Sequence, residues 1–509
     1  MHRNRLTPEF RIILSTFFVL GLCLCAAVST AAESPGRRNI VFILIDDQRY
    51  DAIGRIEPFF ETPHLDALMQ NGVFFENAFV TTSLCSPSRA SFLSGQWAHK
   101  HGVLNNSTPL SPDTPTFPKE LQRAGYKTAF IGKWHMGGGS DAPRPGFDRW
   151  VSFRGQGVYF NPTFNVDGER VPREGYTTDL ITEYAEEFLE QEHDAPFMLY
   201  VSHKAVHADF EPAPRHQGDY EGRRYPFPAS MADTEENYRG RPDWVRAQRN
   251  SWHGVDGLYD NRIDLEQFTL RYAETLKAVD DSVGRIVAKL KARGLLDSTF
   301  LVFTSDNGFQ FGEHGLIDKR TMYEASIRIP LIVHCPELFE GGQRRKQMVL
   351  NTDFNPTFLE AAGLDIPETV QGESFWGVLN DATRPGREAW VYTYFWERSF
   401  AQTPTVLGLR TDRFKLMKFH GIFDRYELYD LENDPNENNN LIGQLYTTTE
   451  AGSVENRVRR ASSPRYRERL GEDVDPEALK ELFQSLNAKL NQELRRIECS
   501  PEPNWRPAP

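Results

Sequence analysis

The chain has 509 residues, of which 39% are hydrophobic and 25% charged, and its formal net charge is −13. This length and composition indicate a large globular protein, with either one large α/β unit and additions or two or more domains. The acidic balance argues against nucleic acid as a partner, because neutralising phosphates requires a basic surface. Any anionic ligand would depend on local groups of Lys and Arg.

The first 32 residues have the pattern of a secretory signal peptide. Arg3, Arg5 and Arg11 precede an apolar run at 12–28, and four small residues follow it. A run of about 17 residues is marginal for spanning a bilayer, and the small residues favour cleavage. We therefore expect residues 1–32 to be removed and the mature protein to be secreted or periplasmic, without stable membrane insertion. An uncleaved anchor is the alternative.

A continuous apolar run at 39–45 predicts a strand that is buried on both faces. Asp46 and Asp47 follow it directly. Open α/β sheets bind ligands at the carboxyl ends of their strands, and two adjacent carboxylates repel each other unless a cation lies between them. The pair predicts part of a cation site; a polar turn after a strand is the alternative.

The stretch at 84–95, LCSPSRASFLSG, carries the most specific chemical signal. Cys85 comes just before a helix-like run, and Arg89 follows four residues later. A thiol at a helix N-terminus beside a fixed cation is expected to have a lowered pKa and to be reactive. A small buried cysteine is the alternative. Cys335 and Cys499 are expected to form a disulfide or to be free thiols.

A strand is expected at 126–131, and it leads into the string GKWH. Lys133 and His135 stand two residues apart beyond the strand end, so both side chains can reach one site at the edge of the sheet. The apolar run at 196–202 predicts a further buried strand, and the string HKAVHADF follows it.

Residues 210–262 differ in character from the rest of the chain. Pro, Arg, Gly and aromatic residues dominate, including Trp244, Trp252 and Tyr259, and there is little apolar periodicity. A long segment without clear elements is often functional. We expect an insertion near the site, with aromatic and Arg side chains available to a ligand; a surface loop with structural aromatic residues is the alternative.

Apolar residues recur at helical spacing over 264–293 and predict a long amphipathic helix, with Asp280 and Asp281 on its solvated side. A second such helix is expected to begin after Asp475, as its cap, and to end near Arg495.

The strand expected at 299–304 ends in the string SDNG, so Asp306 and Asn307 also stand at the carboxyl end of a strand. Together with the first Asp pair they form a set of three carboxylates and one amide oxygen. Such a set favours a hard cation with flexible coordination, calcium before magnesium, whereas zinc would prefer nitrogen or sulfur.

Several of these strings, in the same order, resemble the type I sulfatases of the alkaline phosphatase superfamily. The matching strings include CSPSR at 85–89, GKWH at 132–135 and ELYDLENDPNENNNL at 427–441. The resemblance covers about residues 37–445. An Asn at position 307 counts against the two-zinc phosphatases of the same superfamily, which typically have a histidine there.

The resemblance implies an α/β fold with a large mixed, mostly parallel sheet sandwiched by helices, as in alkaline phosphatase. It also implies a smaller C-terminal α+β subdomain that carries an antiparallel sheet. We expect a seam near residues 375–390, a catalytic domain at 37–380 with the insertion at 210–262, and a C-terminal subdomain at 388–509.

In this family the cysteine that matches Cys85 is oxidised to formylglycine, which implies a formylglycine-generating or anaerobic maturation enzyme as a partner. The resemblance implies one Ca²⁺ held by five residues: Asp46, Asp47, Cys85, Asp306 and Asn307. It implies catalytic roles for six residues: Cys85, Arg89, Lys133, His135, His207 and Lys319.

The resemblance also implies how these side chains divide the work. Lys133 and Lys319 would contact the sulfate, Arg89 would hold the group at position 85, and His135 would hydrogen-bond it. His207 or Lys319 would protonate the departing sugar oxygen.

The family's Pro-His-x-Pro string is altered in this chain, because Val206 and Asp209 replace its prolines. His207 is the best match to the family histidine, and His203 is the alternative or a supporting residue.

The run SHKAVHADFEPAPRH at 202–216 resembles bacterial sulfatases that act on 6-sulfated N-acetylglucosamine in mucin or heparan-type glycans. The expected function is therefore sulfate removal from a sulfated oligo- or polysaccharide, with this sugar first. The alternatives are another polysaccharide, algal or chondroitin-type, a phosphate or phosphonate monoester hydrolase on the same scaffold, and a glycan-binding protein without activity.

Overall fold

The structure is a computed structural model that describes residues 37–238, 240–420, 426–442 and 476–500. The expected signal peptide at 1–32 and the expected cap Asp475 lie outside the described residues. In the described ranges, no helix is long and apolar enough to cross a membrane.

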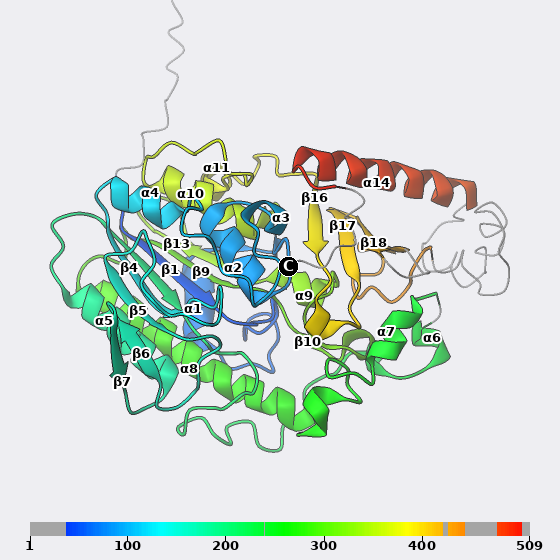
Figure 1. Cartoon of the computed structure of the whole chain (residues 1–509), viewed down its shortest axis with the longest axis horizontal. Helices are drawn as coiled ribbons and strands as arrows, with labels where there is room; N and C mark the ends of the chain where they lie inside the picture. The colour runs from blue at the N-terminus through cyan, green and yellow to red at the C-terminus, as the bar shows by residue number, and fades with distance from the viewer. Residues whose placement is uncertain (1–36, 239, 421–425, 443–475, 501–509) are drawn as a thin grey trace, which may run out of the picture. The chain divides into compact units, whose positions relative to one another are not determined.

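A mixed sheet of ten strands lies between helices in the left half of Figure 1. Its strand order is β14-β2-β13-β9-β1-β8-β4-β5-β6-β7. The neighbours β9, β1, β8, β4 and β5 all pair in parallel, whereas β13 and β6 pair with this central group in antiparallel fashion. The strands are β1 Ile40–Ile45, β2 Val73–Phe75, β4 Lys127–Lys133, β5 Arg149–Phe153, β6 Thr163–Val166, β7 Glu169–Pro172, β8 Phe197–Ser202, β9 Phe300–Ser305, β13 Leu331–His334 and β14 Gln343–Arg345.

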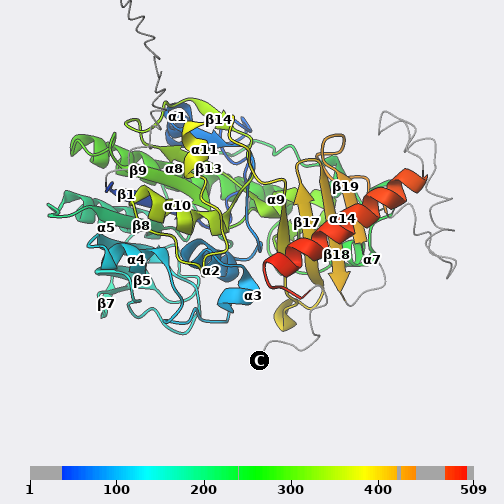
Figure 2. The same cartoon turned by 90° about the horizontal axis from the view of Figure 1, so that it is seen from above.

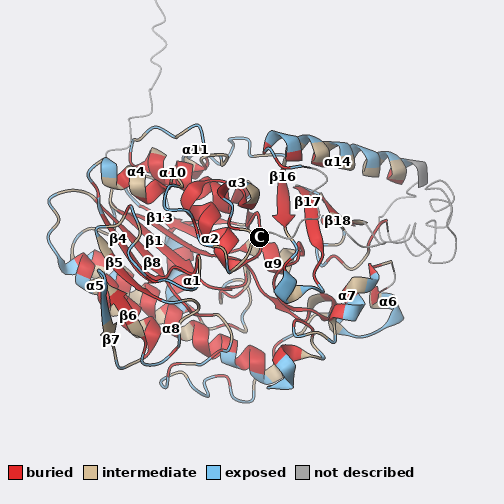
Figure 3. Ribbon diagram, viewed as in Figure 1, coloured by how far each residue is buried: buried red, intermediate tan, exposed pale blue. Residues whose placement is uncertain are grey.

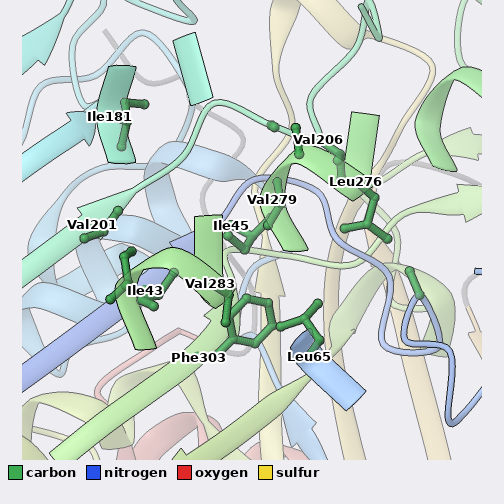
Figure 4. Packing of buried hydrophobic residues seen from close by; sticks show 14 of the residues in the cluster. Ile43, Ile45, Leu65, Ile181, Val201, Val206, Leu276, Val279, Val283 and Phe303 are labelled. Atoms are coloured by element: carbon green, nitrogen blue, oxygen red, sulfur yellow. The ribbon is translucent and has the colours of Figure 1, made fainter. Parts of the chain in front are cut away.

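Strand β1 shows why its sequence is apolar without a break. All six residues are buried, and successive side chains point to opposite faces. Ile43 and Ile45 pack with Val279 and Val283 of one helical layer (Figure 4), whereas Phe42 packs into the other layer. The first layer is α1 Pro63–Asn71, α5 Thr177–Glu190 and α8 Leu265–Ala292, and the second is α2 Cys85–Ser94, α4 Phe117–Arg123, α10 Phe354–Ala361 and α11 Trp376–Asn380.

One of the two aspartates that were predicted on the solvated side of helix α8 is buried instead. Asp280 is only 2% exposed, and its carboxylate accepts hydrogen bonds from the backbone N–H groups of His64 (3.0 Å) and Leu65 (2.7 Å). These N–H groups belong to the first turn of α1, where they have no partner within the helix. The prediction that Asp280 is solvated was wrong. The residue pattern along α8 does not show that the N-terminus of α1 packs against this position.

A second sheet, of four antiparallel strands, follows in the C-terminal part of the described chain. Its strands are β16 Ala389–Tyr394, β17 Thr405–Thr411, β18 Phe414–His420 and β19 Tyr426–Asp430. Helix α14, Pro476–Arg496, lies against β16 and β17 (Figure 2), and its outer side is exposed (Figure 3). The predicted fold class is confirmed; the exact domain limits stay a prediction.

The segment at 210–262 contains short helices that periodicity did not indicate, because each has only one or two turns. They are η1 Ala229–Met231, α6 Glu235–Tyr238, α7 Asp243–Gln248 and η2 Leu258–Asn261. Its tyrosines Tyr220, Tyr225 and Tyr259 are buried, whereas Trp252 is 38% exposed. The tyrosines of the segment are therefore structural, and Trp252 is available at the surface.

The cysteines of the described residues, Cys85, Cys335 and Cys499, are all buried and free. The thiol of Cys335 donates to the carbonyl oxygen of Asp297 (3.5 Å). Of the two alternatives for Cys335 and Cys499, the structure has free thiols.

Candidate active site

The candidate metal ligands come together at the carboxyl ends of two neighbouring strands. Asp46 and Asp47 follow β1, Asp306 and Asn307 follow β9, and these two strands pair in parallel. Cys85 is the first residue of α2, and its Sγ lies 3.4 Å from Asp46 Oδ1. One ligand atom from each of the three aspartates and Cys85 lies within 4.8 Å of the others. Opposite ligands of a hard cation with metal–oxygen distances of about 2.4 Å are about 4.8 Å apart, so this spacing fits such an ion.

Asn307 supplies an independent test of the fit to a cation. Its Nδ2 donates to Asp47 Oδ1 (2.7 Å) and to the carbonyl oxygen of Gly308 (2.8 Å). Its Oδ1 is buried and accepts no hydrogen bond within the described structure. A buried amide oxygen is costly unless a donor or a cation faces it. The oxygen donors present at these strand ends therefore fit a hard cation.

The carboxylates of this cluster do not share one electrostatic environment. Burial, with a contribution from Asp46, raises the pKa of Asp306 to about 7, and burial raises the pKa of Asp47 to about 6. Although burial also acts on Asp46, the charges of Lys133 and Arg89 hold its pKa well below the usual value. A cation between the three carboxylates would favour their ionised forms.

Arg89 joins α2 to the ends of three strands. Its Nε donates to Asp306 Oδ2 (2.8 Å), and its Nη1 donates to the carbonyl oxygen of Lys133 (2.8 Å) and to Ser202 Oγ (2.6 Å). Its Nη2 lies 3.8 Å from Asp46 Oδ2 and makes no hydrogen bond within the described structure. Because Arg89 is one turn beyond the start of α2, these contacts hold that helix N-terminus over the cluster.

The thiol of Cys85 contradicts the lowered pKa that was expected. Cys85 is 0% exposed, and burial raises its pKa well above the ordinary value, although the charge of Lys319 opposes the shift. The prediction was wrong because complete burial outweighs the helix N-terminus and the cations. The side chain of Cys85 nevertheless faces Asp46.

Lys133 reaches the cluster from the end of β4, and His135 follows it by two residues. The ammonium of Lys133 contacts the carboxylate of Asp46 and the side-chain oxygen of Gln156. His135 is buried with a positive φ of 51°, its carbonyl oxygen accepts from Ser86 Oγ, and its Nδ1 has no partner among the described residues. Sequence reasoning missed Gln156, and nothing in its local sequence distinguishes it.

Lys319 reaches the cluster from the segment that follows β9 in the sequence. Its ammonium donates to Asp47 Oδ2 and lies 3.3 Å from Asp318 Oδ1. Asp318 also lies 3.2 Å from His253 Nε2 and accepts from the hydroxyl of Tyr259 (3.2 Å). The segment at 210–262 therefore borders the site through His253 and Tyr259. Asp318 was also missed, although it directly precedes Lys319.

The structure separates the two histidines that follow β8. His207 Nε2 lies 3.9 Å from Asp47 Oδ2, and the side chain is 18% exposed. His203 is completely buried, and its Nε2 lies 3.0 Å from Ser282 Oγ on α8. Of the two histidines, His207 is the one that lies at the cluster, and its catalytic role stays a prediction.

Lys204, between these histidines, is a buried cation that sequence reasoning missed. It is 5% exposed, and its Nζ lies 4.1 Å from the centre of the Tyr159 ring. Within the described ranges no carboxylate forms an ion pair with it. Burial, and then the charge of Lys133, lowers the pKa of Lys204 to about 8.

We expect Lys204→Met to remove a pH dependence of stability. The pKa of Lys204 in the folded chain is below the ordinary 10.5, so the folded chain holds fewer protons between about pH 8 and that value. The free energy of unfolding should therefore rise with pH across this window, by up to about 3 kcal/mol. Urea denaturation at several pH values measures it. Lys291→Met, at an exposed position, is the control; an unchanged rise in the Lys204 variant would contradict the expectation.

Comparison with protein families gives two matches. Residues 38–364 match the model named Sulfatase, and residues 312–463 match the model of the C-terminal part of N-sulphoglucosamine sulphohydrolase.

Two curated relatives extend this similarity. The chain is 35% identical to an N-acetylglucosamine-6-O-sulfatase of Bacteroides thetaiotaomicron, over 83% of this chain and 86% of that protein. It is 31% identical to the N-acetylglucosamine-6-sulfatase of Homo sapiens, over 72% of this chain and 68% of that protein.

Solved structures are similar over most of the chain. One, described as a complex with its substrate D-glucosamine-2-N,6-O-disulfate, has a TM-score of 0.79 and 30% identity, over 91% of this chain and 98% of that one. The phosphonate monoester hydrolase of Agrobacterium radiobacter has a TM-score of 0.69 and 20% identity, over 89% of this chain and 96% of that one. It shares the fold. The family matches and the identity to named sulfatases show that the chain belongs to the type I sulfatases, which hydrolyse sulfuric esters.

Proposed function

We propose that this enzyme removes the 6-O-sulfate of N-acetylglucosamine residues in glycans. The observation that carries the proposal is the 35% identity, over 83% of the chain, to a bacterial enzyme named for this activity. The similar solved structure with a 6-O-sulfated glucosamine as its substrate supports the same sugar.

We further propose that the five oxygen- and sulfur-bearing positions at the strand ends hold Ca²⁺ and that position 85 is converted to formylglycine. The unpartnered Oδ1 of Asn307 and the spacing of the carboxylates support a hard cation. When bound, the cation would supply positive charge toward the sulfate oxygens, and formylglycine would supply the hydroxyl that attacks sulfur.

The roles that we propose for the remaining side chains follow from how deeply each one is buried. Lys133 and Lys319 are 0% and 2% exposed, so they would bind the sulfate group at the inner end of the site. Arg89 holds position 85 in place through its contacts to three strand ends. His135, whose buried Nδ1 has no hydrogen-bond partner among the described residues, would hold the proton of the group at position 85.

His207 is placed to serve the leaving group. Its side chain is 18% exposed, more than those of Lys133 and Lys319, while its Nε2 still lies 3.9 Å from Asp47. The sugar must lie on the open side of the sulfate group. His207 would therefore deliver a proton to the departing sugar oxygen.

The cellular location of the enzyme and its partner in maturation are part of the same proposal. We propose that residues 1–32 direct the chain to the periplasm or the outside; one relative, 29% identical, is named an extracellular sulfatase. The partner in maturation would be an enzyme that oxidises Cys85. Because Cys85 is 0% exposed in the folded chain, this enzyme must act before folding is complete or during local opening.

The test is a panel of defined esters: the 6-sulfate and 3-sulfate of N-acetylglucosamine, galactose 6-sulfate and N-acetylglucosamine 6-phosphate. We expect kcat/KM for the first to exceed the others by about 100-fold, because a site built for one hydroxyl position leaves its polar groups unpaired with another. Release of sulfate or phosphate is measured by ion chromatography. A preference for the phosphate would indicate the monoester hydrolase, and tight binding without release would indicate a glycan-binding protein.

A further inference from the structure

Two exposed tryptophans meet at one turn beside the site. Within the described residues, few large hydrophobic side chains are exposed, and Trp252 (38%) and Trp396 (39%) are among them. Trp252 belongs to the segment at 210–262, and its ring centre lies 6.2 Å from that of Phe400 in the turn η5, Arg398–Phe400. Trp396 donates from Nε1 to the carbonyl oxygen of Ala401 (3.3 Å), at the end of the same turn.

This aromatic group is joined to Lys319 by short contacts. The ring of Trp252 meets that of Tyr259 edge to face at 3.9 Å between centres, and Tyr259 donates to Asp318 (3.2 Å). Asp318 in turn lies 3.3 Å from the ammonium of Lys319. Trp252 is therefore separated from a proposed sulfate-binding lysine by two side chains only.

Phe400 reaches the same carboxylate by a second route. His253 stacks on Phe400 with 4.7 Å between ring centres, and its Nε2 lies 3.2 Å from Asp318 Oδ2. The guanidinium carbon of Arg320 lies 3.7 Å from the centre of the Phe400 ring. Two parts of the chain, the segment at 210–262 and the turn after β16, thus place aromatic rings on one border of the site.

The chemistry of these rings suits a sugar. An exposed indole offers a large flat apolar face to the C–H groups of a pyranose and leaves its hydroxyls in water. The chain carries a net charge of −13, so long-range attraction does not favour a sulfated polymer. A contact that does not depend on charge would therefore supply much of the affinity for sugars beyond the sulfated one.

We propose that Trp252 forms a second sugar subsite, which binds the pyranose next to the residue that carries the sulfate, with Phe400 and Trp396 supporting the turn against which Trp252 packs. This inference rests on the proposed function. It makes the enzyme one that distinguishes an oligosaccharide from the free sulfated monosaccharide. The alternative for Trp252 is an exposed side chain with no role in binding.

The test compares two substrates, N-acetylglucosamine 6-sulfate and a tetrasaccharide that carries the same residue at its non-reducing end. In Trp252→Ala, KM for the tetrasaccharide should rise about tenfold while kcat and KM for the monosaccharide stay unchanged. Trp252→Phe, which keeps a ring, should restore most of the loss. Ile366→Ala, at another exposed hydrophobic residue, is the matched control and should change neither substrate.

Three results would overturn the subsite. Equal changes for both substrates would show that Trp252 acts only through Tyr259 and Asp318. No change for the tetrasaccharide would show that the ring does not bind sugar. If the unaltered enzyme desulfates neither substrate, the proposed function is wrong, and the proposed subsite is then wrong as well.

Discussion

Replacing Cys85 by serine is expected to abolish sulfate release, with kcat/KM at least about 10⁴-fold lower. Position 85 faces Asp46 at the start of α2, and the proposed chemistry needs the oxidised form of this side chain. A serine has the hydroxyl but cannot regenerate itself by elimination, so turnover stops. Sulfate release from N-acetylglucosamine 6-sulfate measures the loss.

Cys335→Ser provides a matched control, because Cys335 is also buried and free but lies beside Asp297. This variant should retain the activity of the unaltered enzyme. Mass spectrometry of the tryptic peptide that contains position 85 should show an aldehyde in place of the thiol in active protein. Full activity in protein whose Cys85 thiol is intact would contradict the proposal.

Removing divalent cations with a chelator is expected to lower activity at least about 100-fold, and Ca²⁺ should restore it better than Mg²⁺ or Zn²⁺. Burial and the charge of Asp46 raise the pKa of Asp306 to about 7, and a bound cation would favour the ionised forms of the carboxylates together. Binding to the folded chain alone should also raise the thermal unfolding temperature. Differential scanning calorimetry with and without Ca²⁺ measures this without relying on activity.

Asn307→Ala should weaken the Ca²⁺-dependent rise in unfolding temperature, because it removes the unpartnered oxygen of the cluster. Asn355 is a close structural control. It is also buried, its Nδ2 donates to the carbonyl oxygen of Leu93 (2.7 Å), and its Oδ1 also lacks a partner among the described residues. Asn355→Ala should leave the calcium response unchanged. An equal response in both variants and the unaltered chain would argue against this metal site.

The sequence by itself determined the features that depend on short stretches of chain. The unbroken apolar run before Asp46 predicted a strand covered on both faces, and β1 is buried on both. The position of Asp46 and Asp306 directly after apolar runs predicted that they would meet at one sheet edge. That expectation needs only parallel neighbouring strands, and β1 and β9 are such neighbours.

Only the tertiary structure decided which partners each side chain has. His203 and His207 follow the same strand, yet one packs on Ser282 of α8 and the other lies beside Asp47. Asp280 fits the polar side of its helix by periodicity, but it caps α1. Trp252 and Phe400 are 148 positions apart in the chain and meet only in the fold.

The physical reason is the range of the forces involved. Apolar periodicity and turn residues are patterns within a few neighbouring residues, so the sequence alone can show where strands, helices and turns form. A pKa or a binding contact depends on burial and on charges brought from distant segments. The raised pKa of Cys85 results from its burial, which the sequence around it does not show. The same stretch of sequence did identify Cys85 as a candidate site residue.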